Sequence, residues 1–192
     1  MMGKLQKKLV EDLISRNSNE KWEIGNRIVS ALGGNPTPQV SGLPPRRGHG
    51  DGGIDGRIPI LIQQRVIREK LKRRSDGMEL PVRIEESKFE WVEAEAGFNI
   101  KIERGCFKRD TLNAFVENLR RERIFAGVIV TTTGLCPDAK SEFERHNAND
   151  IDLCHLSLED LLGGDISCPN INFIVGDLGA QLRVSLREYL TS

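Results

Sequence analysis

The sequence has 192 residues, which is the size of one domain with room for an appendage. Its hydrophobic fraction of 38% and charged fraction of 29% are those of an ordinary globular protein, so global disorder is excluded. The 28 Lys and Arg residues balance the 28 Asp and Glu residues, so attraction of the whole molecule to a polyanion is excluded too. The longest apolar runs, such as residues 124–130, are shorter than the roughly 18 residues of a membrane span, and we expect no membrane segment.

The N-terminus and the cysteines bear on the compartment. The first ten residues are basic but run into Glu11 and Asp12 without an apolar stretch, so we expect a cytoplasmic rather than a secreted protein. No Cys-x-x-Cys pair occurs among the four cysteines, which are Cys106, Cys136, Cys154 and Cys168. We therefore expect reduced thiols, with a zinc site through Cys154 and His155 as the less favoured alternative.

The first part of the chain is predicted to be helical and then rich in turns. Residues 5–32 have the pattern of two helices with a break at residues 17–19, and a Gly-Gly-Asn-Pro sequence ends the second. Residues 36–56 have the composition of turns and lead into a strand at residues 58–62. Residues 65–74 carry six basic residues and one acid, Glu69, so we expect an exposed basic segment there.

Strands and helices alternate in the rest of the chain. Residues 79–84 and 89–94 alternate apolar and polar side chains, which predicts an inserted strand pair before a strand at residues 98–103. Helices are expected at residues 110–123, 137–146 and 176–190, and strands at residues 125–131 and 151–156. This order predicts an α/β fold with a mixed or parallel central sheet flanked by helices. We expect a single domain over residues 1–192, with an insertion at 64–96 and a closing segment at 165–192.

The loop at residues 48–56 carries the densest chemical signal. Asp51 and Asp55 lie among five glycines directly before a predicted strand. Glycine lets the backbone turn sharply and lets a ligand approach, and paired carboxylates hold a hard cation such as Mg²⁺. An Asp-Gly hairpin without a ligand is the alternative. His49 could serve as a base or a phosphate contact in the same loop, although an exposed loop histidine is the simpler interpretation.

A second group consists of Lys101 and Glu103. On a strand these side chains would project from one face about 7 Å apart, because side chains repeat with a period of two. If this strand neighbours the one that starts at Asp55, one pocket holds carboxylates and a lysine. Carboxylates that fix a cation, and a lysine that stabilises charge on the reacting phosphate, suit metal-assisted hydrolysis of a phosphodiester. A solvated strand face is the alternative.

These residues resemble the motifs of the PD-(D/E)xK nuclease superfamily, and within it those of Mrr-type restriction endonucleases. The similar parts are Glu23 in the opening helix, the loop at 50–56, the strand at 100–105, and the block at 127–132 with Ala139 after it. The resemblance implies a restriction-endonuclease-like fold in which the aspartate matching Asp55 binds Mg²⁺, with Mn²⁺ as a substitute. The second motif of the family reads Gln-x-Lys or Glu-x-Lys, whereas Lys101-Ile102-Glu103 has the reverse order.

From this resemblance we expect a Mg²⁺-dependent endodeoxyribonuclease that acts in restriction or in defence against foreign DNA. Asp55, Glu103 and Asp51 would hold the metal, Lys101 would stabilise the transition state, and Glu23 would assist. The reversed motif leaves a second possibility, a nuclease-fold subunit that binds DNA or assembles with partners but no longer cuts.

Double-stranded DNA is the expected partner. Basic side chains beside the metal loop would contact its phosphates, namely those of Arg46, Arg47, Arg65, Arg68, Lys70, Lys72, Arg73 and Arg74. A solvated charged helix is the alternative for residues 65–74. Aromatic residues make up only 5% of the chain and are not interleaved with this basic segment, which favours a duplex over a single strand. Since cutting a duplex takes two cuts, we expect a twofold homodimer.

Overall fold

The computed structural model describes residues 2–37, 53–67, 70–73, 79–82, 87–175, 178–186 and 189. Two helices open the chain, α1 (Met2–Ser15) and α2 (Ser18–Ala31), as the sequence predicted. Asn17 causes the break between them, because its side chain accepts a hydrogen bond from the backbone N–H of Glu20 while the Glu20 carboxylate accepts one from the N–H of Asn17. This capping box fixes where α2 begins.

Six strands form the central sheet, in the order β1-β2-β5-β6-β7 with β8 also paired to β2. Their bounds are β1 (Asn35–Pro36), β2 (Gly56–Ile67), β5 (Ser87–Lys101), β6 (Ala126–Thr131), β7 (Asp152–Ser157) and β8 (Ile171–Phe173). Strands β1, β5 and β8 run antiparallel to β2, whereas β5, β6 and β7 are parallel to one another. The predicted mixed sheet in an α/β fold is thus confirmed.

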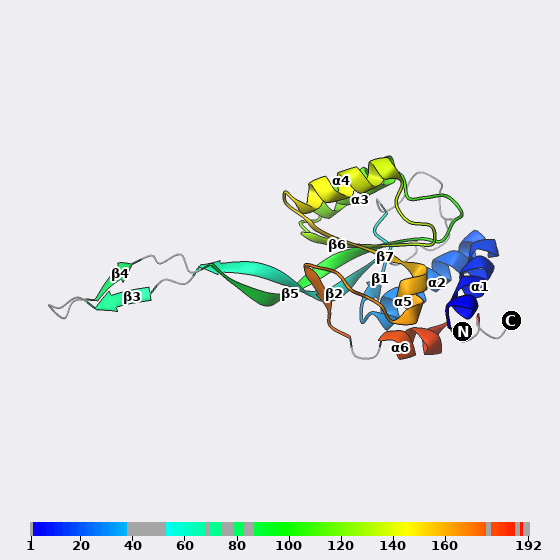
Figure 1. Cartoon of the computed structure of the whole chain (residues 1–192), viewed down its shortest axis with the longest axis horizontal. Helices are drawn as coiled ribbons and strands as arrows, with labels where there is room; N and C mark the ends of the chain where they lie inside the picture. The colour runs from blue at the N-terminus through cyan, green and yellow to red at the C-terminus, as the bar shows by residue number, and fades with distance from the viewer. Residues whose placement is uncertain are drawn as a thin grey trace.

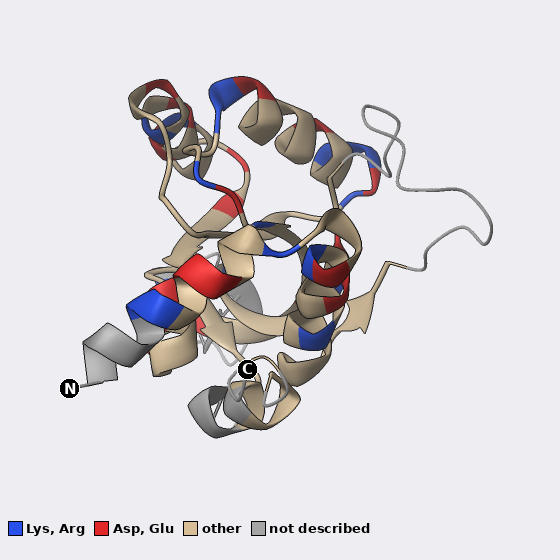
Figure 2. Ribbon diagram, turned by 90° about the vertical axis from the view of Figure 1, so that its right-hand side faces the viewer, with Lys and Arg blue, Asp and Glu red and all other residues tan. Residues whose placement is uncertain are grey.

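Helices cover both faces of this sheet (Figure 1). One buried cluster unites α1, α2, α5 (Leu158–Gly163) and α6 (Leu178–Ser185) with one face, and the other unites α3 (Arg109–Arg121) and α4 (Pro137–Asn147) with the opposite face. Every residue of β6 is buried, with Val128 and Val130 in the first cluster and Ile129 in the second. The prediction of a strand covered on both faces is confirmed. Basic and acidic residues are interspersed along the helices (Figure 2).

Strands β2 and β5 continue past the helices as a two-stranded ribbon (Figure 1). Their pairing runs without interruption from Gly56 opposite Phe98 to Ile67 opposite Ser87. Two short strands at the far end, β3 (Lys70–Arg73) and β4 (Glu79–Val82), pair with each other. The expected pairing of 79–84 with 89–94 is therefore wrong. Residues 89–94 instead belong to the same strand as Phe98, because the alternation of that segment continues through Ala96 without a turn.

The cysteines form two disulfides, so the expectation of reduced thiols is wrong. Cys106 is bonded to Cys136, with Cα atoms 5.2 Å apart, and Cys154 to Cys168, with Cα atoms 5.7 Å apart. The first disulfide joins the loop after β5 to the residue that caps α4. The partners are 30 and 14 positions apart in sequence, so only the folded chain shows which thiols meet.

None of the helices that the structure describes has the length and apolar character needed to span a bilayer.

Candidate functional site

A pocket of about 280 Å³ brings Asp55, Lys101 and Glu103 together where β5 ends. Asp55 directly precedes β2, and Lys101 is the last residue of the neighbouring strand β5. Helix α2 forms the opposite wall, and the remaining lining residues are Ser18, Lys21, Trp22, Gly25, Asn26, Ile100 and Ile102. The expected pocket with carboxylates and a lysine therefore exists.

Hydrogen bonds to backbone groups hold both the main chain and the side chain of Asp55. Its N–H donates to the carbonyl of Phe98 over 2.7 Å, and its carbonyl accepts from the N–H of Thr37 over 2.9 Å. Its carboxylate oxygen Oδ2 accepts from the N–H of Ile100 over 2.8 Å. The last bond ties the carboxylate to β5, so the position of this side chain relative to Lys101 is set by the sheet.

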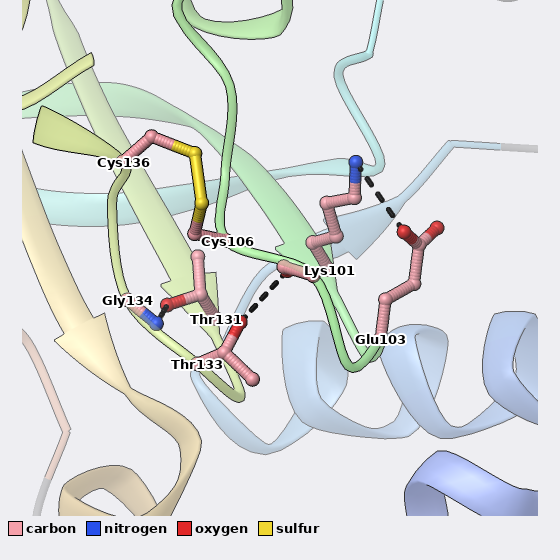
Figure 3. Close-up of a disulfide and its surroundings, with 8 residues drawn as sticks. Lys101, Glu103, Cys106, Thr131, Thr133, Gly134 and Cys136 are labelled. Atoms are coloured by element: carbon pink, nitrogen blue, oxygen red, sulfur yellow. Dashed lines mark hydrogen bonds and ion pairs between the residues drawn. A yellow bond between two sulfur atoms is a disulfide. The ribbon is translucent and has the colours of Figure 1, made fainter. Parts of the chain in front are cut away.

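Lys101 and Glu103 meet for a different reason from the one that the sequence suggested. Strand β5 ends at Lys101, and Glu103 lies in the bend that follows, so the two residues do not share a strand face. The bend nevertheless brings Lys101 Nζ to 3.5 Å from Glu103 Oε2, and the side chains point toward each other (Figure 3). Nζ also lies 5.9 Å from the ring centroid of Phe107. The lysine side chain is 23% exposed and that of the glutamate 59%, so Glu103 is at the mouth of the pocket.

The sequence interpretation overlooked Asn99. Asn99 lies two positions before Lys101 on β5. Asn99 is buried, and its Nδ2 donates to the carbonyl of Gly53 in the loop before Asp55. The amide two positions before Lys101 was the signal in the sequence.

Glu23 lies outside this pocket. Its carboxylate accepts a hydrogen bond from Arg27 over 2.9 Å, and Arg27 in turn donates to the carbonyl of Ser185 over 3.1 Å. Helix α2 instead presents Lys21 and Asn26 to the pocket. At 100° per residue, position 23 projects from a neighbouring face of the helix, so this chain brings an amide and a cation where an acid was expected.

The loop before the pocket is only partly described. Asp51, His49, Arg46 and Arg47 lie outside the described residues, so their expected roles stay predictions. Within the described ranges, no three or more His, Cys, Asp and Glu side chains are grouped closely enough to hold a metal ion. The carboxylates of Asp55 and Glu103 have the hard oxygen donors that Mg²⁺ and Mn²⁺ prefer, and Asp51 was the third expected ligand.

The basic segment lies far from the pocket, so the expectation that it sits beside the metal loop is wrong. Arg65 is exposed on β2 and pairs with Phe89, twelve positions before Lys101 on β5, which is about 40 Å along the strand. Strand β3 includes Lys70, Lys72 and Arg73 at the end of the ribbon, whereas Arg68 and Arg74 lie outside the described residues.

Aromatic side chains lie beside Arg65 on the ribbon. Phe89, 63% exposed, is directly opposite Arg65, and Trp91, 41% exposed, is opposite Gln63. Opposite residues in an antiparallel pair share a face, so an arginine and a glutamine are interleaved with two aromatic rings. The sequence interpretation separated these residues because they are more than 20 positions apart.

A larger pocket of about 550 Å³ lies along β7, where it is lined by His155 and the disulfide of Cys154 and Cys168. Burial lowers the pKa of His155, which favours the neutral form of its imidazole. Nε2 of this ring shares a hydrogen bond of 2.9 Å with the hydroxyl of Thr131. This pocket contains neither Asp55 nor Lys101.

The chain matches no protein-family model, and no curated protein or solved structure is significantly similar to it.

Proposed function

We propose that this chain is a metal-dependent endodeoxyribonuclease that hydrolyses phosphodiester bonds of double-stranded DNA, in restriction or defence against foreign DNA. The observation that carries the proposal is the convergence of Asp55, Lys101 and Glu103 on one pocket at the ends of adjacent strands. Two carboxylates with a lysine beside them are the residue types that metal-assisted phosphodiester hydrolysis needs.

The chemistry of each side chain sets its proposed role. Asp55 and Glu103, together with Asp51, would hold Mg²⁺ or Mn²⁺ through carboxylate oxygens. A bound divalent cation supplies a polarised phosphate oxygen and an acidified water molecule. Lys101 would place its ammonium group beside the phosphate and stabilise the negative charge that develops on it. Lys21, on the opposite wall, would add a second cation for the DNA backbone.

A second candidate is a non-cutting subunit of the same fold that binds DNA or assembles with a partner. The ion pair between Lys101 and Glu103 favours it, because an ammonium 3.5 Å from the carboxylate competes with a metal for that ligand. Glu23, which was expected to assist, is turned to Arg27. Only the first candidate predicts cleavage.

A plasmid-nicking assay separates the two candidates. Wild type should convert supercoiled plasmid to open circles in Mg²⁺ or Mn²⁺, and Asp55→Asn, which keeps the side-chain shape, should be at least 10²-fold slower because it removes the charge that holds the cation. Glu122→Gln is a matched control, since Glu122 lies outside the pocket and pairs with Arg57. If wild type never cuts faster than Asp55→Asn in either metal, the non-cutting subunit replaces the nuclease.

A further inference from the structure

The loop after β6 is hydrogen-bonded to the bend that contains Glu103. The N–H of Thr132 donates to the carbonyl of Lys101 over 3.2 Å. The hydroxyl of Thr132 accepts a hydrogen bond from the N–H of Glu103 over 3.1 Å and donates to the carbonyl of the same residue. One side chain therefore bonds both backbone polar groups of Glu103.

Further bonds join the loop after β6 to the loop after β5. The Thr133 hydroxyl donates to the carbonyl of Gly105 over 2.7 Å, and the N–H of Phe107 donates to the carbonyl of Gly134 over 2.9 Å. The disulfide of Cys106 and Cys136 closes the far end (Figure 3). We call residues 132–136, with these bonds to residues 101–107, the clasp.

Of the two threonine hydroxyls in the clasp, that of Thr132 is the one hydrogen-bonded to Glu103. Because β5 ends at Lys101, no sheet pairing fixes the backbone of Glu103, and its side chain is largely exposed. A ligand in such a bend would lose conformational freedom when it binds a metal, and that loss weakens binding. Hydrogen bonds that order the backbone beforehand remove part of this cost.

We infer that Thr132 is a positioning residue that holds Glu103 in place to bind the divalent cation of this pocket. The inference rests on the proposed function, because it gives Glu103 the role of a metal ligand. Valine at position 132 keeps the shape of threonine but leaves the N–H and carbonyl of Glu103 without this partner. Serine keeps the hydroxyl. Thr133→Val is the matched control, since its hydroxyl bonds Gly105 and not Glu103.

The test measures the Mn²⁺ dissociation constant of the full chain by the electron paramagnetic resonance signal of free Mn²⁺. Thr132→Val should bind Mn²⁺ about tenfold more weakly than wild type, whereas Thr132→Ser and Thr133→Val should bind it nearly as wild type does. A merely structural role would not distinguish Thr132→Val from Thr133→Val. Melting temperatures show that each variant is folded, and Thr132→Ala replaces the valine variant if that one does not fold.

The outcomes separate this inference from the proposed function. Wild type that binds Mn²⁺, with Thr132→Val that binds it equally well, overturns the positioning role alone. Equal weakening in Thr132→Val and Thr133→Val also overturns it, because the effect then belongs to the whole clasp. Wild type that binds no Mn²⁺ overturns the metal site, and the positioning role with it.

Discussion

The two ends of strand β5 are held in different ways. Its last residues, 97–101, pair with β6, Gly97 and Phe98 also pair with β2, and the clasp fixes the bend that follows. Residues 87–96 pair with β2 alone within the described part of the chain, and they expose Phe89 and Trp91. The first end holds side chains in fixed relative positions, which chemistry requires, whereas the second displays side chains that a partner can reach.

The end of β5 beside the pocket should be more sensitive than the ribbon to an exchange of two side chains. The double change Lys101→Glu with Glu103→Lys conserves net charge, and it would preserve activity if both residues projected from one strand face. Because β5 ends at Lys101, the two positions are not equivalent, and we expect the nicking rate to fall by about 10² to 10³. A double variant that cuts as fast as wild type would show that the order of the pair is immaterial, and the nicking assay above measures it.

The covered part of the sheet should be sensitive to one added methyl group. A Cβ at Gly127 would lie 2.8 Å from Leu119 and 2.9 Å from both Phe115 and Leu153, all of which are buried. Gly127→Ala should therefore lower the free energy of unfolding by about 1 to 3 kcal/mol through overpacking. Gly105→Ala is the control, because nothing lies within 4 Å of its added Cβ. Urea unfolding measures both, and equal midpoints would contradict the packing described for α3.

A substitution on the exposed ribbon formed by β2 and β5 should weaken DNA binding without changing the stability of the fold. Arg65→Ala removes one exposed cation about 40 Å from the pocket, so we expect a several-fold loss of affinity for a 30-base-pair duplex and a salt dependence shallower by about one ion. Arg121→Ala, an exposed arginine at the end of α3, is the control. Fluorescence anisotropy at several salt concentrations measures affinity. If Arg65→Ala binds as wild type does, the ribbon is not a DNA contact.

Periodicity predicted most of the elements, and it did so where packing on a helix or sheet face dictates the pattern. Helices α2, α3 and α4 and strands β6 and β7 begin and end within a few residues of the predicted positions. Helix α3 begins at Arg109 with Lys108 as its N-cap, one residue before the predicted start at residue 110. A cap depends on the local backbone path, which side-chain spacing does not reveal.

The site was only partly predictable, because its residues meet through turns and across strands. Asp55 and Lys101 were identified from the sequence, and the register of β2 with β5 brings them together. Glu103 was placed on a strand that ends before it, and Glu23 projects from the wrong face of α2. Strand endings, helix rotation and cysteine pairing are properties of the folded chain, so a motif alone could not supply them.

Diffraction from a crystal soaked in Mn²⁺ shows directly whether Asp55 and Glu103 bind a divalent cation together, because anomalous scattering locates the ion without any assumption about activity. We expect one Mn²⁺ peak in the pocket, with oxygen atoms of Asp55 and Glu103 about 2.0 to 2.3 Å away and Lys101 Nζ turned from Glu103 toward the space where a phosphate binds. A fully soaked crystal with no peak there, and with Lys101 still paired to Glu103, would contradict it.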